Sequence, residues 1–370
     1  MTMHDTSSNK KYPWLVLHLI PGLGNIAFKN LLSVFGTPER ILQAGLSNLM
    51  SVNGIREGIA RKIVAKACEK DPTRLLKTID LMGARILCYH DPEYPSLLKK
   101  IHDPPMILYL KGKAIPTKKI RVAIVGSRNP TPYGLKAAEK IARGIAMRGF
   151  GVVSGMARGI DTAAHKGCLA GGGFTIAVLG TGIDRVYPSS NKALYEHISQ
   201  HGTLLSEFPP GTPPEPRNFP IRNRIISGLS KGVVVAEATM KSGSLITASL
   251  ALDQGRDIFA VPGSINSFKS AGSHFLIKQG AALVENADDV LEGLGLNFNS
   301  SLKTVAPKEQ PLPPMDESER SVFDTLGDYP VHIDQIAREA GLDQARVSGL
   351  LIKMELKGLI RQLPGKMFVR

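Results

Sequence analysis

The run RVAIVGS at residues 121–127 has the composition of a fully buried β-strand and ends in a glycine loop. Six similar runs follow it: FGVVSG (150–155), FTIAVLG (174–180), GTLLSEF (202–208), GVVVAEA (232–238), DIFAVPG (257–263) and a short AALVE (281–285). Helical patterns fit between most of them, at about 132–148, 160–171, 191–201, 221–230, 244–254 and 273–279. Near-continuous Val, Ile and Ala runs that alternate with helices predict an α/β fold with a parallel sheet covered on both faces.

Several of these strands end in small, polar loops. They are Gly126-Ser127-Arg128, the run from Ser154 and Gly155 through Arg158 and Gly159, Gly180-Thr181-Gly182, and Ser242-Gly243-Ser244. Ligands of parallel sheets bind beyond the carboxyl ends of the strands. Small residues let the backbone approach a phosphate, and helix N-termini supply partial positive charge. The loops therefore predict an anion-binding edge.

The segment RNFPIRNRIISGLS, residues 217–230, adds basic, amide and aromatic side chains. Arginines bind phosphate through a planar fork of donors, asparagines hydrogen-bond base edges, and Phe219 offers a face for base stacking. We expect a helix from about residue 221, with Ile221, Ile225, Ile226 and Leu229 packed on the sheet and the polar start facing a ligand. A solvated basic loop is the alternative. The combination favours nucleic acid, and single strands in particular, because their bases are free to stack.

The charge distribution points to the same part of the chain. The net charge is +14, and residues 76–300 carry 26 basic and 17 acidic side chains. Residues 1–75 carry ten and five, whereas residues 301–370 carry ten of each. A basic excess in the middle of the chain indicates a polyanionic partner there.

The cysteines and the hydropathy pattern suggest a cytoplasmic location. The three cysteines are isolated from one another and from histidine pairs, which argues against a zinc site or a disulfide framework and fits a reducing compartment. No apolar run reaches membrane-spanning length, and the N-terminus lacks the core of a signal peptide. We expect no metal, no cofactor and no membrane contact.

The two flanking regions have patterns of their own. In residues 1–75, LIPGLGNIAFKNLLSVFG and VNGIREGIARKIV resemble a pair of helix-hairpin-helix motifs, which either contact DNA phosphate or only pack or bind protein. Residues 80–298 form the α/β unit, and 299–316 read as a proline-rich linker. Residues 317–370 predict a winged helix. Its second helix carries Ala345, Val347, Ser348 and Gly349, so protein interaction is at least as well supported as duplex recognition.

Signatures of nucleotide enzymes are weak. The chain has no G-x-x-x-x-G-K-[ST] loop and no G-x-G-x-x-G followed by an acid, which argues against P-loop hydrolysis and dinucleotide binding. Glu207 and Glu237 at strand ends are either an acid pair for sugar chemistry or anchors for arginines and loops. We expect Asp161 to cap a helix or to pair with Arg158, and His165 to be packed rather than catalytic.

The motifs as a set resemble the DNA processing protein A (DprA/Smf) family. Seven blocks carry the likeness in the family's order: VGSRNPTPYG, SGMARGIDTAAHKGCL, VLGTGIDRVYP, SEFPPGTPP, FPIRNRIISGLS, VVVAEATMKSGSLITASLALDQGRDIFAVPG and GSHFLIKQGAALV. The resemblance implies an extended Rossmann domain that binds single-stranded DNA and forms a homodimer. It also implies protection of incoming DNA and loading of a RecA-type recombinase during natural transformation and recombination, without catalysis. The apolar stretch 258–284 is the candidate dimer face.

The resemblance also transfers site residues. Arg128, Phe219, Arg222 and Asn223 match the family's DNA pocket, Arg217 takes the place of a basic residue found before the aromatic, and Lys241 with Ser242 to Thr247 forms a pocket wall. With the loop and segment residues above, the predicted DNA-binding set is Gly126, Ser127, Arg128, Ser154, Gly155, Arg158, Gly159, Arg217, Asn218, Phe219, Arg222, Asn223, Arg224, Lys241, Ser242, Gly243, Ser244 and Thr247. The alternative is an enzyme like the nucleotide phosphoribohydrolases, but their P-G-G-x-G-T-x-x-E block is missing, with Pro262-Gly263-Ser264 its nearest match.

Overall fold

A computed structural model describes residues 4–296, 315–327 and 329–370. Its centre is a nine-stranded sheet in the order β1-β2-β6-β5-β4-β3-β7-β8-β9. All seven apolar runs form parallel strands, as predicted. They are β3 (Arg121–Val125), β4 (Gly151–Ser154), β5 (Thr175–Leu179), β6 (Thr203–Ser206), β7 (Gly232–Val235), β8 (Asp257–Ala260) and β9 (Ala282–Leu283).

Two strands at one edge were not predicted from the sequence. β1 (Ala84–Cys88) and β2 (Ile107–Gly112) pair antiparallel with each other, and β2 pairs antiparallel with β6. They extend the parallel core into a mixed sheet. This edge of the sheet contacts the helical front of the chain, by which we mean the N-terminal helices between residues 4 and 81.

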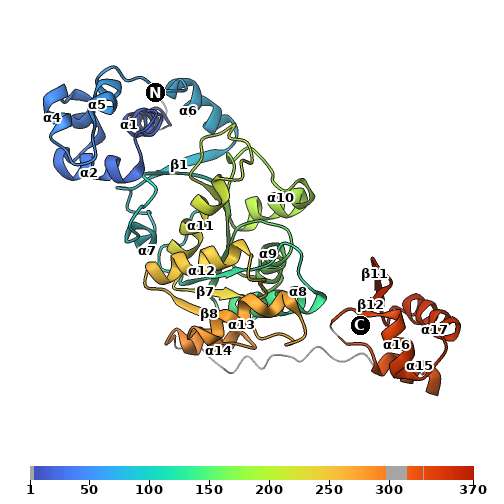
Figure 1. Ribbon diagram of the computed structural model, residues 1–370. Coiled ribbons are helices and arrows are strands. Elements are labelled where there is room, and N and C mark those ends of the chain that lie inside the picture. Colours follow the sequence, from blue (N-terminus) through green and yellow to red (C-terminus); the bar gives the residue numbers. More distant parts are fainter. Residues whose placement is uncertain (1–3, 297–314, 328) are drawn as a thin grey trace.

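Helices cover both faces of the sheet (Figure 1). Successive strand residues point to opposite faces, so Val122 and Ile124 pack in one cluster while Ala123 and Val125 pack in the other. The first cluster includes α8 (Pro132–Met147), α9 (Ile160–Ala170) and α14 (Ala287–Gly293). The second includes α11 (Asn218–Gly228), α12 (Gly243–Asp253) and α13 (Ala271–Lys278). α10 (Lys192–His201) packs against β2, β5 and β6, and the short α7 (Ser96–Lys99) packs beside α11.

The helix that carries the basic segment begins earlier than predicted. α11 starts at Asn218 rather than near residue 221. Ile225, Ile226 and Leu229 are buried as expected, but Ile221 is 46% exposed and does not join the packed stripe. Phe219, Arg222 and Arg224 are therefore on one rigid helix, and Arg217 is its N-cap.

The helical front shares a core with the sheet. It consists of α1 (His4–His18), α2 (Asn25–Phe35), α3 (Pro38–Gln43), α4 (Leu46–Met50), α5 (Glu57–Val64) and α6 (Pro72–Leu81). Leu15, Phe28 and Leu31 belong to the same buried cluster as Tyr109 of β2 and Leu179 of β5. The front is thus packed against the sheet as part of one hydrophobic core.

The tail has a winged-helix fold, which confirms that expectation. α15 (Glu317–Asp324), α16 (Ile333–Ala340) and α17 (Gln344–Leu356) pack around Val322, Ile336 and Leu351. β10 (Val331–His332), β11 (Arg361–Leu363) and β12 (Met367–Val369) form a three-stranded sheet in the order β10-β12-β11. The predicted linker 299–316 lies outside the described residues, apart from its last two positions. None of the described helices is both long and apolar enough to cross a bilayer.

Candidate nucleic-acid interface

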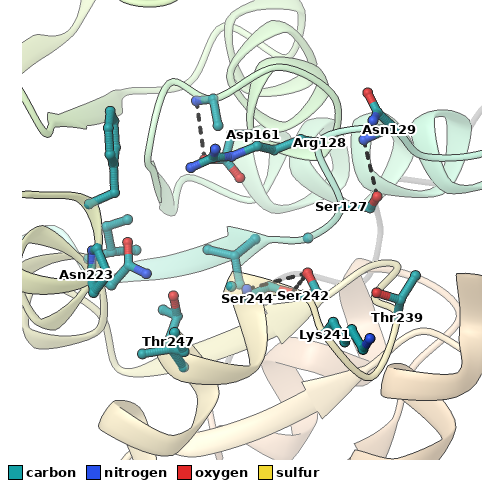
Figure 2. A pocket seen from close by; sticks show the side chains of 18 of the residues that line it. Ser127, Arg128, Asn129, Asp161, Asn223, Thr239, Lys241, Ser242, Ser244 and Thr247 are labelled. Atoms are coloured by element: carbon teal, nitrogen blue, oxygen red, sulfur yellow. Dashed lines mark hydrogen bonds between the residues drawn. The ribbon is translucent and has the colours of Figure 1, made fainter. Parts of the chain in front are cut away.

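A cavity of about 750 Å³ opens where the loops after β3 and β4 meet α11 and the start of α12. Figure 2 shows Ser127, Arg128 and Asn129 on one side, and Asn223, Ser244 and Thr247 on the other. Eleven of the predicted residues line it: Gly126, Ser127, Arg128, Phe219, Arg222, Asn223, Lys241, Ser242, Gly243, Ser244 and Thr247. Ser242 caps α12 by accepting a hydrogen bond from the Ser244 backbone N–H at 3.4 Å. The structure thus brings together segments about 120 residues apart in the sequence.

Phe219 is held in a cation–π arrangement inside this cavity. The Cζ atoms of Arg128 and Arg222 lie 5.4 and 5.8 Å from its ring centroid. The Tyr187 ring packs at 5.4 Å with an interplanar angle of 42°. Gly180 lies against the ring, because a Cβ added there would be 2.8 Å from Cδ1 of Phe219. The ring is therefore fixed in place before any ligand arrives.

Arg222 forms the charged floor of the cavity. Its side chain is buried, and Nη1 donates to the carbonyl oxygens of Gly155, at 2.6 Å, and of Val178. Burial lowers the pKa of the guanidinium to about 10, an effect opposed by the nearby Asp161 carboxylate. Arg222 is thus cationic at neutral pH, and its position is fixed by the backbone.

Asp161 is a structural residue beside Arg222, but it does not cap α9 as expected, because the N-cap is Gly159 and has no side-chain hydrogen bond. Its Oδ2 accepts hydrogen bonds from the backbone N–H groups of Gly155 at 3.1 Å and Ala157 at 3.3 Å. Burial raises the pKa of Asp161, whereas Arg222 and these two N–H groups lower it. Asp161 therefore fixes the loop after β4 and compensates the charge of Arg222.

A second, smaller cavity adjoins the first and contains Gly155 and Arg158. The two cavities share Arg128, Tyr187 and Phe219 in their walls. Gly159 lets the two loops meet, since its φ is +78° and a Cβ there would lie 2.4 Å from the Ser127 carbonyl oxygen. Ser154 is buried and donates to the Ile124 carbonyl at 2.6 Å, which makes it a structural residue.

Five of the predicted residues lie outside both cavities: Ser154 and Gly159, described above, and Arg217, Asn218 and Arg224. Arg217 has a side chain that is 79% exposed and pairs with Glu215 at 2.6 Å. Asn218 is buried and donates to the Pro213 carbonyl at 3.4 Å. Arg224 pairs with Glu207 and Asp103 on another side of α11, because two helical steps rotate it about 200° from Arg222. The expectation that all three arginines of the segment face one ligand does not match this geometry.

Several lining residues were missed by the sequence reasoning. They are Asn129, Tyr187, Thr239, Ile246, Phe268 and Lys269. Tyr187 belongs to the VLGTGIDRVYP block, so its aromatic ring beside a strand-end loop was a usable signal. Phe268 and Lys269 come from a short 3-10 turn, Phe268–Ser270, which has no periodic pattern to reveal it.

The two glutamates hold separate parts of the structure rather than forming an acid pair. Glu237 accepts a hydrogen bond from the Thr131 backbone N–H at 3.0 Å and another from the Thr131 hydroxyl at the start of α8. Glu207 accepts from Arg224 at 2.6 Å and from Asn25 at 2.7 Å. Neither lines the two cavities. The anchoring alternative is the one that the geometry supports.

His165 is packed, as expected. Its Nδ1 lies 2.7 Å from the hydroxyl of Thr175, which itself donates to the Val152 carbonyl, so Nδ1 carries the proton. Burial lowers the pKa of His165 to about 3. A neutral, buried imidazole of this kind is a core residue. In the described part of the chain, no group of three or more His, Cys, Asp or Glu side chains is placed to hold a metal ion.

A methyl group at Gly180 tests whether the Phe219 ring must be fixed. Gly180→Ala forces that ring to move, and we expect affinity for an unstructured oligonucleotide to fall about tenfold through partial loss of base stacking. Gly45→Ala is the matched control, because a Cβ there meets no atom within 4 Å and the residue lies outside both cavities. Equal affinities of the two variants in fluorescence anisotropy would show that the ring is not a stacking platform.

Comparison with known proteins identifies the family. The family model described as DNA recombination-mediator protein A matches residues 85–295, and the DprA winged helix domain matches residues 306–366. Protein Smf of Synechocystis sp. is 35% identical, over 96% of this chain and 98% of that protein. DNA processing protein DprA of Streptococcus pneumoniae is 50% identical over 54% of this chain and 71% of its own length.

Two solved structures extend the comparison. The X-ray structure of DNA processing protein A from Streptococcus pneumoniae is 38% identical with a TM-score of 0.66, covering 79% of this chain and 98% of that one. A structure that describes the single-stranded DNA binding mode of DNA processing protein A from Helicobacter pylori is 33% identical with a TM-score of 0.51, covering 57% of this chain and 95% of that one. The family models match both the sheet region and the winged helix, and this chain belongs to the DNA recombination-mediator protein A family, also called DprA or Smf.

Proposed function

We propose that this protein binds single-stranded DNA, independently of sequence, in the cavity between the β3 and β4 loops and α11. The observation that carries the proposal is the fixed stack of Arg128, Phe219 and Arg222 at the carboxyl edge of the sheet. Guanidinium groups bind phosphate, and an aromatic face accepts any base. In a duplex the base faces are already stacked, so this arrangement favours a single strand.

The rest of the cavity suits a nucleic-acid backbone. Lys241 and Lys269 add positive charge at its wall. The N-terminus of α12, with Gly243 at its first position, supplies backbone N–H groups to an anion. In the adjoining cavity Arg158 continues the basic surface past Phe219. A strand that runs over Phe219 would therefore meet cations on both sides of the stacked base.

The relatives support a role in DNA processing. The Streptococcus pneumoniae relative is named as a DNA processing protein, and the Helicobacter pylori structure describes a single-stranded DNA binding mode. By this likeness we propose that the protein protects incoming single strands and loads a RecA-type recombinase on them during natural transformation and recombination. We place it in the cytoplasm. Its three cysteines are all free, which suits that compartment.

The protein acts without chemistry on its ligand in this proposal. The support is that Glu207 and Glu237, the candidate acids of a phosphoribohydrolase-like enzyme, are bound to Arg224 and Thr131 and stand apart from the cavities. A release of free base from nucleoside monophosphates that is abolished by Glu237→Gln would reverse this assignment.

We propose a homodimer through the 258–284 region. Within this stretch Ile265 and Phe268 are 89% and 75% exposed, and Phe275 and Leu283 also present apolar surface. Exposed apolar side chains gathered in one stretch are typical of protein interfaces.

We further propose that the chain divides into a helical domain (1–75), a Rossmann-like domain (80–298), a linker (299–316) and a winged-helix domain (317–370).

Recombinase loading is the part of the proposal that needs its own experiment. Single strands would be coated with a single-strand-binding protein, and filament formation by a RecA-type recombinase followed through its ATP hydrolysis. We expect this protein to shorten the lag before filament formation. With the double variant Arg128→Ala, Phe219→Ala, the lag should be as long as in a reaction that contains neither form of the protein. If the wild type and the double variant shortened the lag equally, recombinase loading would not depend on DNA binding in the cavity.

A further inference from the structure

The helix that presents the DNA-binding side chains is anchored to the front of the chain by a buried polar cluster. We define this anchor cluster as Asn25, Asp103, Glu207 and Arg224. Arg224 Nη2 donates to Glu207 Oε1 at 2.6 Å, and its Nε donates to Asp103 Oδ2 at 3.2 Å. The same Oε1 of Glu207 accepts a hydrogen bond from Asn25 Nδ2 at 2.7 Å. One carboxylate oxygen thus joins α2 of the front to α11 of the sheet domain.

Asn25 also binds the sheet directly. It is the first residue of α2, and its Oδ1 accepts a hydrogen bond from the Met106 backbone N–H at 3.1 Å, just before β2. Its amide therefore spans the end of the β6 strand, where Glu207 follows Ser206, and the start of β2. Asn25 lies within the first predicted helix-hairpin-helix copy, at the start of α2, so its side chain is used for packing within the chain.

The cluster is costly to disturb because two of its three charged side chains are buried, while Asp103 is 37% exposed. The side chains of Arg224 and Glu207 are only 10% and 8% exposed. A buried ion pair holds its geometry tightly, since loss of one partner leaves the other charge without compensation. Burial raises the pKa of Glu207, and the hydrogen bonds from Arg224 and Asn25 lower it, so Asn25 helps to keep this carboxyl ionised.

Arg224 is a further point at which the helix that bears the cavity side chains is held. Arg224 follows Arg222 by two residues on α11, and Phe219 and Asn223 belong to the same helix. A helix transmits a shift at one side to the other because its backbone is rigid over a few turns. A displacement of Arg224 toward solvent would tilt Phe219 and Arg222 away from Arg128.

We propose that Asn25 and Glu207 are positioning residues for the single-strand site, which makes the helical front a working part of that site without contact to the strand. The inference rests on the proposed function for its effect on DNA, but its structural part is independent of DNA. It assigns to the front a role in ordering α11, whatever its own surface binds.

Asn25→Ala tests the inference, with Asn30→Ala as the matched control. Asn30 lies on the same helix and donates to the Asn53 carbonyl at 3.1 Å within the front, away from the anchor cluster. In the free protein we expect Asn25→Ala to speed amide hydrogen exchange in α11 several-fold relative to α14, and Asn30→Ala to leave it unchanged. Unchanged exchange in Asn25→Ala would overturn the inference, whether or not the protein binds DNA.

The same variants are then titrated with an unstructured oligonucleotide. Asn25→Ala should weaken binding about five- to tenfold through a lost hydrogen bond to a charged group, with the salt slope of the wild type, because no phosphate contact is removed. Faster exchange in α11 together with unchanged affinity would also overturn the inference. The anchor cluster would then stabilise α11 without positioning the DNA-binding side chains. Should Asn25→Ala fail to fold, Asn25→Ser keeps a donor for Glu207 and takes its place, with a smaller expected loss. Failure of the wild type itself to bind would refute the proposed function alone.

Discussion

Replacing both Arg128 and Phe219 with alanine is expected to weaken binding of single-stranded DNA by two to three orders of magnitude. Base stacking contributes about 1–3 kcal/mol per base, and a charge-assisted hydrogen bond about 1.5–3 kcal/mol. Both side chains line the two adjoining cavities, so both contributions are lost together. Fluorescence anisotropy with an unstructured oligonucleotide measures the change.

Arg143→Ala provides the matched control for the charge. Arg143 is exposed on α8 and lies outside both cavities, so its loss removes one positive charge without touching the site. We expect this variant to bind within about threefold of the wild type, as distant exposed charges are screened by salt. If the double variant and Arg143→Ala lost similar affinity, binding would reflect general surface charge.

The second large effect concerns stability. Arg222→Met is expected to lower the free energy of unfolding by about 3–5 kcal/mol, because it leaves the buried Asp161 carboxylate without its cation. The carbonyls of Gly155 and Val178 lose their donor as well. Urea unfolding followed by circular dichroism measures the loss.

The double variant Arg222→Met, Asp161→Asn tests whether the uncompensated Asp161 carboxylate causes the loss of stability. The side-chain amide that replaces the Asp161 carboxylate would still accept, through its oxygen, from the backbone N–H groups of Gly155 and Ala157, but without a buried charge. We expect the double variant to regain more than half of the lost stability while DNA binding stays weak. Additive losses in the double variant would mean that Arg222 and Asp161 do not compensate each other.

Most of the sheet could be predicted from the sequence because a buried parallel strand leaves a local signature. Each of the seven runs is dense in Val, Ile, Leu and Ala and is bounded by glycine. β1 lacks that signature because Arg85 interrupts its apolar pattern, whereas β2 carries a comparable run, ILYLKG, that the prediction missed. The place of this pair in the sheet depends on the pairing of β2 with β6, far along the chain, which no local pattern reveals.

The site was predictable as a set of loops but not residue by residue. Strand-end glycines and the Arg-Asn-Phe segment located the cavity, because parallel strands bring their carboxyl ends to one edge. The individual directions on α11 were not available, since the helix begins at Asn218 and turns about 100° per residue. Arg224 was therefore assigned to DNA although it pairs with Glu207. The shared hydrophobic core of the helical front and the sheet could not be predicted either, because it is formed by residues far apart in the sequence.

The most direct test of the account is a comparison of single-stranded and duplex oligonucleotides by fluorescence anisotropy at several salt concentrations. If Arg128, Arg158, Arg222 and Lys241 each bind a phosphate, log affinity for the single strand should fall against log salt with a slope of about −3. The account predicts this slope together with tighter binding of the single strand than of its duplex. A duplex preference, or weak binding of both, would contradict the claim that the cavity is a single-strand site.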